Sequence, residues 1–221
     1  SWGWLDTLDS KIAKEIEIVS GDIRDFDSVK NATKNCDLIF HLAALVAIPY
    51  SYYAPEAYVD TNIKGTLNIL RSIKENKNLR LIHTSTSEIY GTPKSLPITE
   101  EHPTSAQSPY AASKVGADHL ALSFQKSFNL PITIVRPFNA FGPRQSLRAV
   151  IPTIITQIFN NKKIIKLGNT FSTRNFNYIS DTIDGFIRFI GKNNLDGEII
   201  NLGSNYDISI VDTVKIISQL M

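Results

Sequence analysis

The sequence predicts an α/β protein built on a doubly wound parallel sheet, and two observations support this fold class. Short, fully apolar runs such as residues 38–42 are typical of strands buried on both faces. These runs alternate along the chain with segments whose apolar residues recur at helical spacing. Ligands of such sheets bind beyond the carboxyl ends of the strands, so we look for functional residues there.

The elements of the main part follow from periodicity, caps and turn residues. In chain order we expect a strand at 16–19, a helix at 27–34 capped by Asp27, a strand at 38–42, a helix at 55–76, a strand at 79–83, a loop at 91–108, a helix at 110–128 and a strand at 132–135. The helix at 55–76 should bury its apolar stripe, which consists of Val59, Ile63, Leu67, Leu70 and Ile73.

The composition shifts after residue 141, where Gly142-Pro143-Arg144 interrupts the alternation. Beyond it we expect a helix at 152–160, strands at 164–167 and 175–179, a helix from Asp181, a strand at 198–202 and a helix from 211. We therefore predict a main domain over residues 1–141 and a smaller, partial α/β region over residues 142–221.

Composition limits the classes of function. The chain has 221 residues, of which 43% are hydrophobic and 20% charged, as in an ordinary globular protein. A formal net charge of +2 gives no general attraction for polyanions, so we predict no nucleic-acid partner. No apolar run approaches the ~20 residues of a membrane span. The single cysteine, Cys36, excludes an internal disulfide; we expect it to be buried and the protein to be cytoplasmic.

The helix at 110–128 carries a candidate catalytic pair. Tyr110 and Lys114 are four residues apart, so they lie on one helix face about one turn apart. A nearby ammonium lowers the pKa of a phenol, and such a phenol is a usable general base toward a sugar hydroxyl. The alternative is that Tyr110 is a half-buried helix residue and Lys114 its solvated neighbour.

Further candidates follow the predicted strands at their carboxyl ends. Gly21-Asp22, Ala43-Ala44, Ser85-Thr86 and Phe138-Asn139 each come directly after one of four strands. In a parallel sheet these four positions meet at one edge. No cluster of cysteine and histidine residues is present, so we predict no metal site.

Six segments, in family order, resemble the extended short-chain dehydrogenase/reductase family of nucleotide-sugar epimerases and dehydratases. They are Gly21–Asp25, His41–Ala44, Asn62–Thr66, Tyr110 with Lys114, Arg136–Arg144, and Thr173–Asp181, in which Asn175 stands where Asp is usual. The resemblance implies a Rossmann-like domain that binds NAD and a region that binds a nucleotide-diphosphate sugar. It also implies a homodimer formed through the helices at 55–76 and 110–128.

The segment Ser85–Gly91 resembles the 4,6-dehydratases within that family. Ser87-Glu88 is similar to GDP-mannose 4,6-dehydratases and also to UDP-glucuronate decarboxylases, whereas the related epimerases tend to lack the glutamate. The wider pattern, including Ala47-Ile48-Pro49, is most similar to the N-acetylglucosamine 4,6-dehydratases of legionaminic acid biosynthesis. A C4 epimerase, a UDP-glucuronate decarboxylase and a non-catalytic fragment that binds nucleotide remain the alternatives.

The resemblance assigns roles residue by residue. The catalytic residues would be Thr86, Ser87, Glu88, Tyr110 and Lys114; the cofactor-binding residues Asp22, Ile23, Leu42, Ala43, Ala44, Asn62, Thr84, Tyr110 and Lys114; and the substrate-binding residues Ser85, Thr86, Asn139, Arg148 and Arg174. Asp22 would contact adenine, and the two arginines suit a diphosphate because a guanidinium fork matches phosphate oxygens. The alternatives are a turn-forming Asp22, a structural Asn62 and plain surface arginines.

The implied reaction is a dehydration without net redox change. Tyr110 would take the C4 hydroxyl proton, Glu88 the C5 proton, and Ser85 or Thr86 would donate a hydrogen bond to the C4 oxygen. Many dehydratases carry Asp at the Ser87 position as the acid for the C6 hydroxyl. Without that Asp, either Glu88 serves as both base and acid, or a water relays the proton.

The family's Gly-rich turn after its first strand, which holds the cofactor pyrophosphate, is absent from these residues. We therefore expect the chain to be truncated at both ends, to lack the first βαβ segment, and to bind NAD more weakly than a version extended at the N-terminus.

Overall fold

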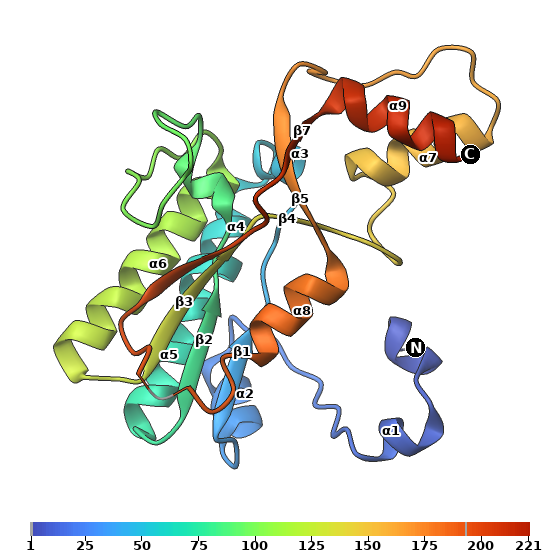
Figure 1. Ribbon diagram of the computed structural model, residues 1–221. Coiled ribbons are helices and arrows are strands. Elements are labelled where there is room, and N and C mark those ends of the chain that lie inside the picture. The colour runs from blue at the N-terminus through green and yellow to red at the C-terminus, as the bar shows by residue number, and fades with distance from the viewer. Residues whose placement is uncertain (1, 193) are drawn as a thin grey trace.

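The computed structural model, described here for residues 2–192 and 194–221, is built on a parallel sheet (Figure 1). Its strands are β1 (Leu38–His41), β2 (Arg80–Thr84), β3 (Ile132–Pro137) and β6 (Ile199–Leu202), in the spatial order β1-β2-β3-β6. Every neighbouring pair is parallel. All four carboxyl ends therefore lie at the same edge, and three of them, those of β1, β2 and β3, are among the four that the sequence predicts to meet there.

Helices cover both faces of this sheet, which confirms the doubly wound fold class. On one face, α2 (Phe26–Thr33), α5 (Gly65–Glu75) and α6 (Pro109–Phe128) pack on the sheet through a cluster that includes Leu70, Leu81 and Ile134. On the other face, α8 (Ile179–Ile187) and the turn after it bring Phe186 and Phe189 against β2, β3 and β6. The runs at 38–41 and 132–135 are mostly apolar, with His41 and Thr133 as the exceptions, because they meet a helix on each side.

The predicted helix at 55–76 is present but its register is not uniform. It consists of α4 (Pro55–Tyr58), a π-helical segment η2 (Val59–Lys64) and α5. The wider π turn rotates the buried face, so Val59, predicted to be buried, is 50% exposed. The polar residues Asn62 and Thr66 are buried instead.

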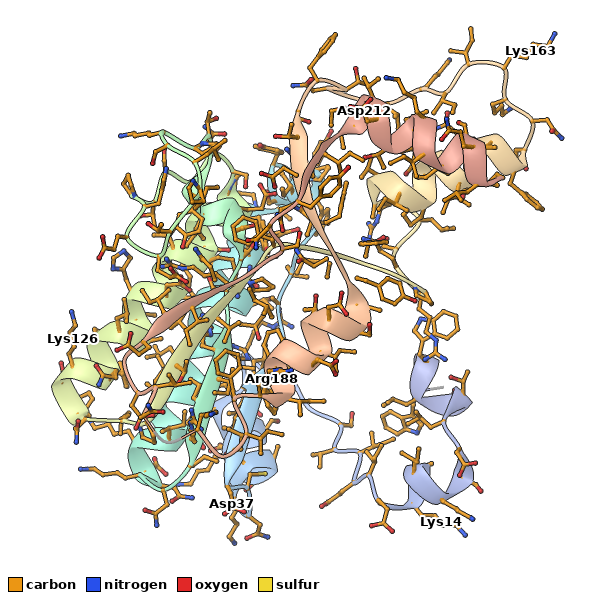
Figure 2. All side chains as sticks on the ribbon, in the orientation of Figure 1. Lys14, Asp37, Lys126, Lys163, Arg188 and Asp212 are labelled. Carbon is orange, nitrogen blue, oxygen red and sulfur yellow. The ribbon has the colours of Figure 1, made fainter. Side chains whose placement is uncertain are left out.

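A second, smaller sheet follows the main one. β4 (Asn139–Phe141) pairs in parallel with β5 (Thr173–Tyr178), and β5 pairs antiparallel with β7 (Asp207–Ser209). The helices α7 (Val150–Phe159) and α9 (Ile210–Leu220) lie together beyond it, where Figure 2 labels Lys163 and Asp212. The chain returns to the main sheet between these elements, because α8 covers that sheet and β6 pairs with β3. The domain boundary at residue 141 stays a prediction. The strand β6, which belongs to the main sheet, comes after that boundary in the sequence.

The N-terminal residues extend away from the main sheet (Figure 1). They contain two short helical segments, η1 (Gly3–Thr7) and α1 (Ser10–Lys14). The strand predicted at 16–19 is wrong: these residues pair with no strand in the described chain, and Val19 is 55% exposed. A β-branched run forms a strand only where a neighbouring strand completes its hydrogen bonds.

The strand predicted at 164–167 is also wrong, for a reason visible in its hydrogen bonds. The backbone N–H of Lys166 donates to Gln157 Oε1 at 2.8 Å, and its carbonyl accepts from Gln157 Nε2 at 3.0 Å. A side-chain amide of α7 thus takes the place of a neighbouring strand, and Ile164 is 75% exposed.

Two local predictions near α2 need correction. Asp25, rather than Asp27, caps this helix, because its carboxylate accepts the backbone N–H groups of Asp27 and Ser28. Cys36 is exposed, because it lies in the turn between α2 and β1 rather than in the strand. Among the described residues, none of the helices combines the length and apolar character needed to span a bilayer.

A glycine fixes the start of the 91–108 loop, which follows the short helix η3 (Ser87–Tyr90). Gly91 has φ +63°, and a Cβ built there would overlap the carbonyl oxygen of Ser105. We predict that Gly91→Ala lowers the free energy of unfolding by about 1–3 kcal/mol, measured by urea denaturation. Gly168→Ala, a control in a loop where an added Cβ meets nothing, should change it by less than about 0.5 kcal/mol. Equal effects of the two variants would contradict the assignment.

Candidate active site

A cleft of about 650 Å³ opens at the carboxyl edge of the main sheet, between the 91–108 loop and the segment leading into β5. Its lining includes Ser87, Glu88, Phe138, Asn139 and Arg174. A smaller cavity, of about 450 Å³, lies at the opposite edge beside Asp37 (Figure 2) and is lined by none of the predicted site residues. The cleft at the carboxyl edge is therefore the candidate active site.

The start of α6 places the predicted catalytic pair beside this cleft. Ser108 caps the helix by accepting the backbone N–H of Ala111 at 3.1 Å, and Pro109 occupies the first helical position. The helix therefore begins one residue before Tyr110. Tyr110 is 7% exposed and Lys114 is 4% exposed, so both lie on the face of α6 that packs on the protein.

The amine of Lys114 is held by a backbone carbonyl at the end of β2. Its Nζ donates to the carbonyl oxygen of Thr84 at 2.6 Å. Burial lowers the pKa of Lys114 from 10.5 to about 8, while the charge of Asp118 acts in the opposite direction. The alternative of a solvated Lys114 is therefore wrong.

The environment of Tyr110 corrects the expectation for its acidity. Burial raises the pKa of this phenol, a hydrogen bond from Thr86 lowers it, and the charge of Glu88 raises it. The prediction that Lys114 lowers the pKa of Tyr110 is wrong for this arrangement, because desolvation is the largest effect and the amine is directed at Thr84. The hydrogen bond places Thr86 beside the Tyr110 hydroxyl, and the charge of Glu88 reaches that hydroxyl.

The turn after β2 presents its polar side chains in two directions. Ser87 and Glu88 are half-buried and line the cleft. Thr86 Oγ1 accepts the backbone N–H of Glu88 at 3.2 Å, which leaves the hydroxyl proton of Thr86 available to Tyr110. Ser85 is buried, and its hydroxyl donates to Asp118 Oδ2 at 2.9 Å. Of the two predicted donors to a substrate oxygen, Ser85 is therefore engaged within the protein, and the role of Thr86 stays a prediction.

Asn62 is engaged within the protein rather than free for a cofactor. Its Oδ1 accepts the backbone N–H of Leu45 at 2.8 Å, and its Nδ2 donates to Leu45 O at 3.0 Å and to Ser113 Oγ at 2.9 Å. Both amide hydrogens are used, so the structural alternative for Asn62 holds. The residue fastens the turn after β1 to α6.

The other predicted cofactor-binding residues at this edge lie directly after β1 and at the end of β2. Leu42 and Ala43 are exposed and Ala44 is half-buried, all directly after β1. Thr84 Oγ1 is buried and has no hydrogen-bond partner among the described residues. These groups and the buried amine of Lys114 lie at the edge where the sequence predicts NAD to bind, and their contact with the cofactor stays a prediction.

The predicted adenine contact, Asp22, lies in the stretch before α2. Its carboxylate pairs with Arg24 Nη2 at 2.6 Å, and hydrogen bonds from Arg24 lower the pKa of Asp22 to about 2. The Ile23 side chain packs where a Cβ on Gly65 would lie, so α5 approaches this stretch closely. Asp22 follows no strand, but its neighbour Ile23 is held against the main helical layer.

The predicted substrate residues separate into two groups. Asn139 and Arg174 both line the cleft, and Asn139 Nδ2 donates to the backbone of Asn175 at 3.3 Å. Arg148 is exposed in the turn before α7 and does not line the cleft; burial raises the pKa of Tyr58, and the charge of Arg148 only partly opposes that rise. The two arginines predicted to share a diphosphate are therefore not brought to one cavity.

Sequence reasoning missed a buried charge cluster under the cleft. Asp118 is 2% exposed and pairs with Arg136 at 3.1 Å, while His83 Nε2 lies 3.3 Å from its Oδ1. Burial lowers the pKa of His83. Burial also favours the protonated form of Asp118, but its hydrogen bonds and the adjacent charges prevail and lower the pKa of Asp118. The signal was present, because Asp118 follows Tyr110 and Lys114 at the same four-residue interval.

This fold, with Tyr110 and Lys114 at the carboxyl edge of a doubly wound sheet, defines an extended short-chain dehydrogenase/reductase. The profile of the GDP-mannose 4,6 dehydratase family matches residues 1–219, and the chain belongs to that family. The human dTDP-D-glucose 4,6-dehydratase is 31% identical over 98% of this chain and 62% of its own length. The UDP-glucuronate 4-epimerase of Thermodesulfobacterium geofontis is 35% identical over 90% of this chain and 62% of its own length.

Solved structures give the same picture. A dTDP-glucose 4,6-dehydratase from Streptomyces venezuelae, crystallised with NAD, superposes with a TM-score of 0.84 at 28% identity, over 90% of this chain and 62% of that one. The UDP-glucuronic acid 4-epimerase of Bacillus cereus, in complex with UDP-glucuronic acid and NAD, also gives 0.84, at 32% identity over 90% and 64% of the two chains. The chain spans 62% of the human relative's length and 50% of a Dictyostelium discoideum relative's length.

The buried amine of Lys114 predicts a specific dependence of stability on pH. Between pH 8 and 10 the folded protein loses the Lys114 proton while the unfolded chain keeps it, so the unfolded state binds more protons and stability rises with pH. We predict that the free energy of unfolding of the wild type, measured in urea, rises relative to that of Lys114→Met by at most about 1.4 kcal/mol per pH unit in this window. Lys126→Met, an exposed lysine on the same helix (Figure 2), should show no such trend. A difference that falls with pH for Lys114→Met would contradict the assignment.

Proposed function

We propose that this chain is the catalytic part of an NAD-dependent nucleotide-sugar 4,6-dehydratase that converts a nucleotide-diphosphate N-acetylhexosamine into its 4-keto-6-deoxy sugar. The observation that carries the proposal is the presence of Glu88 in the cleft, close enough to Tyr110 for its charge to act on the phenol. A C4 epimerase on this scaffold needs the tyrosine but has no step that requires a carboxylate beside C5.

The first task of these residues is to remove the proton of the C4 hydroxyl. Tyr110 accepts it as a phenolate, which the Thr86 hydroxyl stabilises by donating a hydrogen bond, and becomes a neutral phenol. Burial opposes ionisation of Tyr110, so a cation close to the reacting hydroxyl is needed. Lys114, one turn further along α6, would be that cation once its amine turns from the Thr84 carbonyl, and it would also hold the nicotinamide ribose. NAD, when bound, supplies the acceptor for the C4 hydride and returns that hydride at C6.

The second task is elimination of water across C5 and C6. A ketone at C4 acidifies the C5 hydrogen, and Glu88 removes that proton as the C6 hydroxyl departs. Ser87 is a poor acid because a serine hydroxyl has no accessible ionisation near neutral pH. We propose that Glu88 returns the proton it has taken to the leaving C6 oxygen, so that one carboxylate serves both steps. Arg174 and Asn139, at the outer end of the cleft, hold the diphosphate and the sugar.

The role of Glu88 is testable by one isosteric change. We predict that Glu88→Gln lowers 4-keto-6-deoxy sugar formation at least ~100-fold, because an amide cannot accept the C5 proton. The measurement is mass spectrometry of products from UDP- and GDP-N-acetylglucosamine, which detects the loss of one water. Glu101→Gln, an exposed glutamate in the 91–108 loop, is the matched control and should keep wild-type turnover.

The outcomes separate the candidate functions. Sugar product epimerised at C4 by both the wild type and Glu88→Gln would replace the dehydratase proposal with an epimerase. Loss of carbon dioxide from UDP-glucuronate would indicate the decarboxylase. Nucleotide binding without any change in substrate would indicate a non-catalytic protein.

We also propose that the protein forms a homodimer through α6 and the helical segment 55–75. These two elements pack against each other and leave Ser123 exposed on α6. We predict that Ser123→Arg shifts the protein toward monomer in sedimentation velocity, because a buried charge without a partner is costly at an interface. Ser180→Arg, at an exposed position in α8, should leave the sedimentation coefficient unchanged. Identical behaviour of both variants and the wild type would place any interface elsewhere.

A further inference from the structure

The segment Ser85–Tyr90 carries the proposed reactive groups Thr86 and Glu88, and its first residue is tied to helix α6. Ser85 Oγ donates to Asp118 Oδ2 at 2.9 Å, and both side chains are buried. Asp118 lies one turn after Lys114 and two turns after Tyr110 on the same face of α6. The hydrogen bond thus joins the helix that carries the proposed base Tyr110 to the first residue of this segment.

The last residue of the segment is tied to the same carboxylate through one intermediate. Arg136 on β3 donates to Asp118 Oδ2 from Nε at 3.2 Å and from Nη2 at 3.1 Å. Its remaining terminal nitrogen, Nη1, donates to the Tyr90 hydroxyl at 2.9 Å, and the guanidinium lies 5.2 Å from the centre of the Tyr90 ring. Asp118 therefore orients Arg136, and Arg136 holds Tyr90.

We infer that Asp118 is a positioning residue that fixes both ends of the segment Ser85–Tyr90 and thereby holds Thr86 and Glu88 beside Tyr110. The catalytic consequence rests on the proposed function, whereas the fixing of the segment does not. Asp118 itself touches neither the cleft nor its contents, since it is 2% exposed and does not line the cavity.

A carboxylate is the group this position requires. Asp118 Oδ2 accepts three hydrogen bonds, two of them from a buried guanidinium that carries a full charge. An asparagine of the same shape has only one acceptor oxygen, carries no charge, and would point an N–H₂ group at His83 or at Arg136. Removing one partner of a buried ion pair leaves the other charge uncompensated, so Arg136 would be free to move and Tyr90 with it.

The anchoring also extends to the loop that borders the cleft. Tyr90 donates to Asn201 Oδ1 at 2.7 Å, and Asn201 on β6 contacts Glu100 through its backbone N–H at 2.8 Å. The carbonyl of Ile98, which lines the cleft, accepts from Asn201 Nδ2 at 3.3 Å. Release of Tyr90 would therefore loosen the segment and one wall of the cleft together.

The experiment compares Asp118→Asn with the wild type in the NAD-loaded protein by two independent measurements. Hydrogen–deuterium exchange of the peptide that covers residues 85–90 should become roughly tenfold faster in the variant, while exchange in α9 stays unchanged. Turnover of the nucleotide sugar should show kcat lower by roughly 10- to 100-fold with KM within about threefold, because the groups move relative to the bound sugar without losing contact with it. Asp184→Asn, an exposed aspartate on α8, is the matched control for both measurements.

Two further variants keep the test decisive if Asp118→Asn does not fold. Tyr90→Phe keeps the ring and removes the hydroxyl, with its hydrogen bonds to Arg136 and Asn201, and Ser85→Ala removes the hydrogen bond at the other end of the segment. Each variant should speed hydrogen–deuterium exchange at its own end of the segment and lower kcat severalfold. When either change is combined with Asp118→Asn, kcat of the double variant should fall by less than the product of the two single effects. Faster exchange in a protein that turns over no nucleotide sugar would support the positioning role and overturn only the proposed function. Unchanged exchange and unchanged kcat in folded variants would overturn the inference.

Discussion

The buried pairing of Asp118 with Arg136 is the interaction on which the geometry of the candidate site depends. It joins α6 to β3 beneath the cleft, with both side chains at most 5% exposed. Such a pair adds little net stability, because the cost of desolvating two charges offsets most of their attraction. Its effect is on position: a charge that finds its partner in only one arrangement defines how helix and sheet are placed. The hydrogen bonds to Ser85 and Tyr90 then transmit that placement to the residues between them.

Burial gives the site its chemical character. Desolvation raises the pKa of Tyr110 and lowers that of Lys114, so both residues are pushed toward their neutral forms. A neutral phenol and a weakly held ammonium are poor catalysts by themselves, but small additions of charge or hydrogen bonding shift such groups strongly. The Thr86 hydroxyl already acts on Tyr110 in the direction of phenolate, and the negative charge of Asp118 acts on Lys114 in the direction of ammonium. The site is thus balanced so that neighbouring groups set the protonation states.

Much of this arrangement could be predicted from sequence, because parallel strands and helical spacing follow from local patterns. The apolar run at 38–42 and the four-residue interval of Tyr110 and Lys114 placed the correct residues at the correct edge. Failures occurred where a distant partner decides the outcome. Residues 16–19 have strand composition but no neighbouring strand, and Gln157 satisfies the backbone of Lys166 in place of one. Asn62 looked like a cofactor ligand until its three hydrogen bonds within the protein were known. Asp118 was overlooked because its partners, Ser85 and Arg136, lie far from it in the sequence.

Similarity over the whole chain does not separate the possible reactions, since a dehydratase and an epimerase are 31% and 35% identical to it over most of its length. Both reactions begin with the same removal of a C4 proton, so they share the scaffold and the residues that serve that step. They diverge only at C5, where elimination needs a second base and epimerisation does not. The discriminating information therefore resides in the few residues that face C5, and we propose that in this chain these are Ser87 and Glu88, which line the cleft. A carboxylate that lines the cleft and whose charge reaches Tyr110 is positioned as a second base would be, which supports our proposal of elimination over epimerisation.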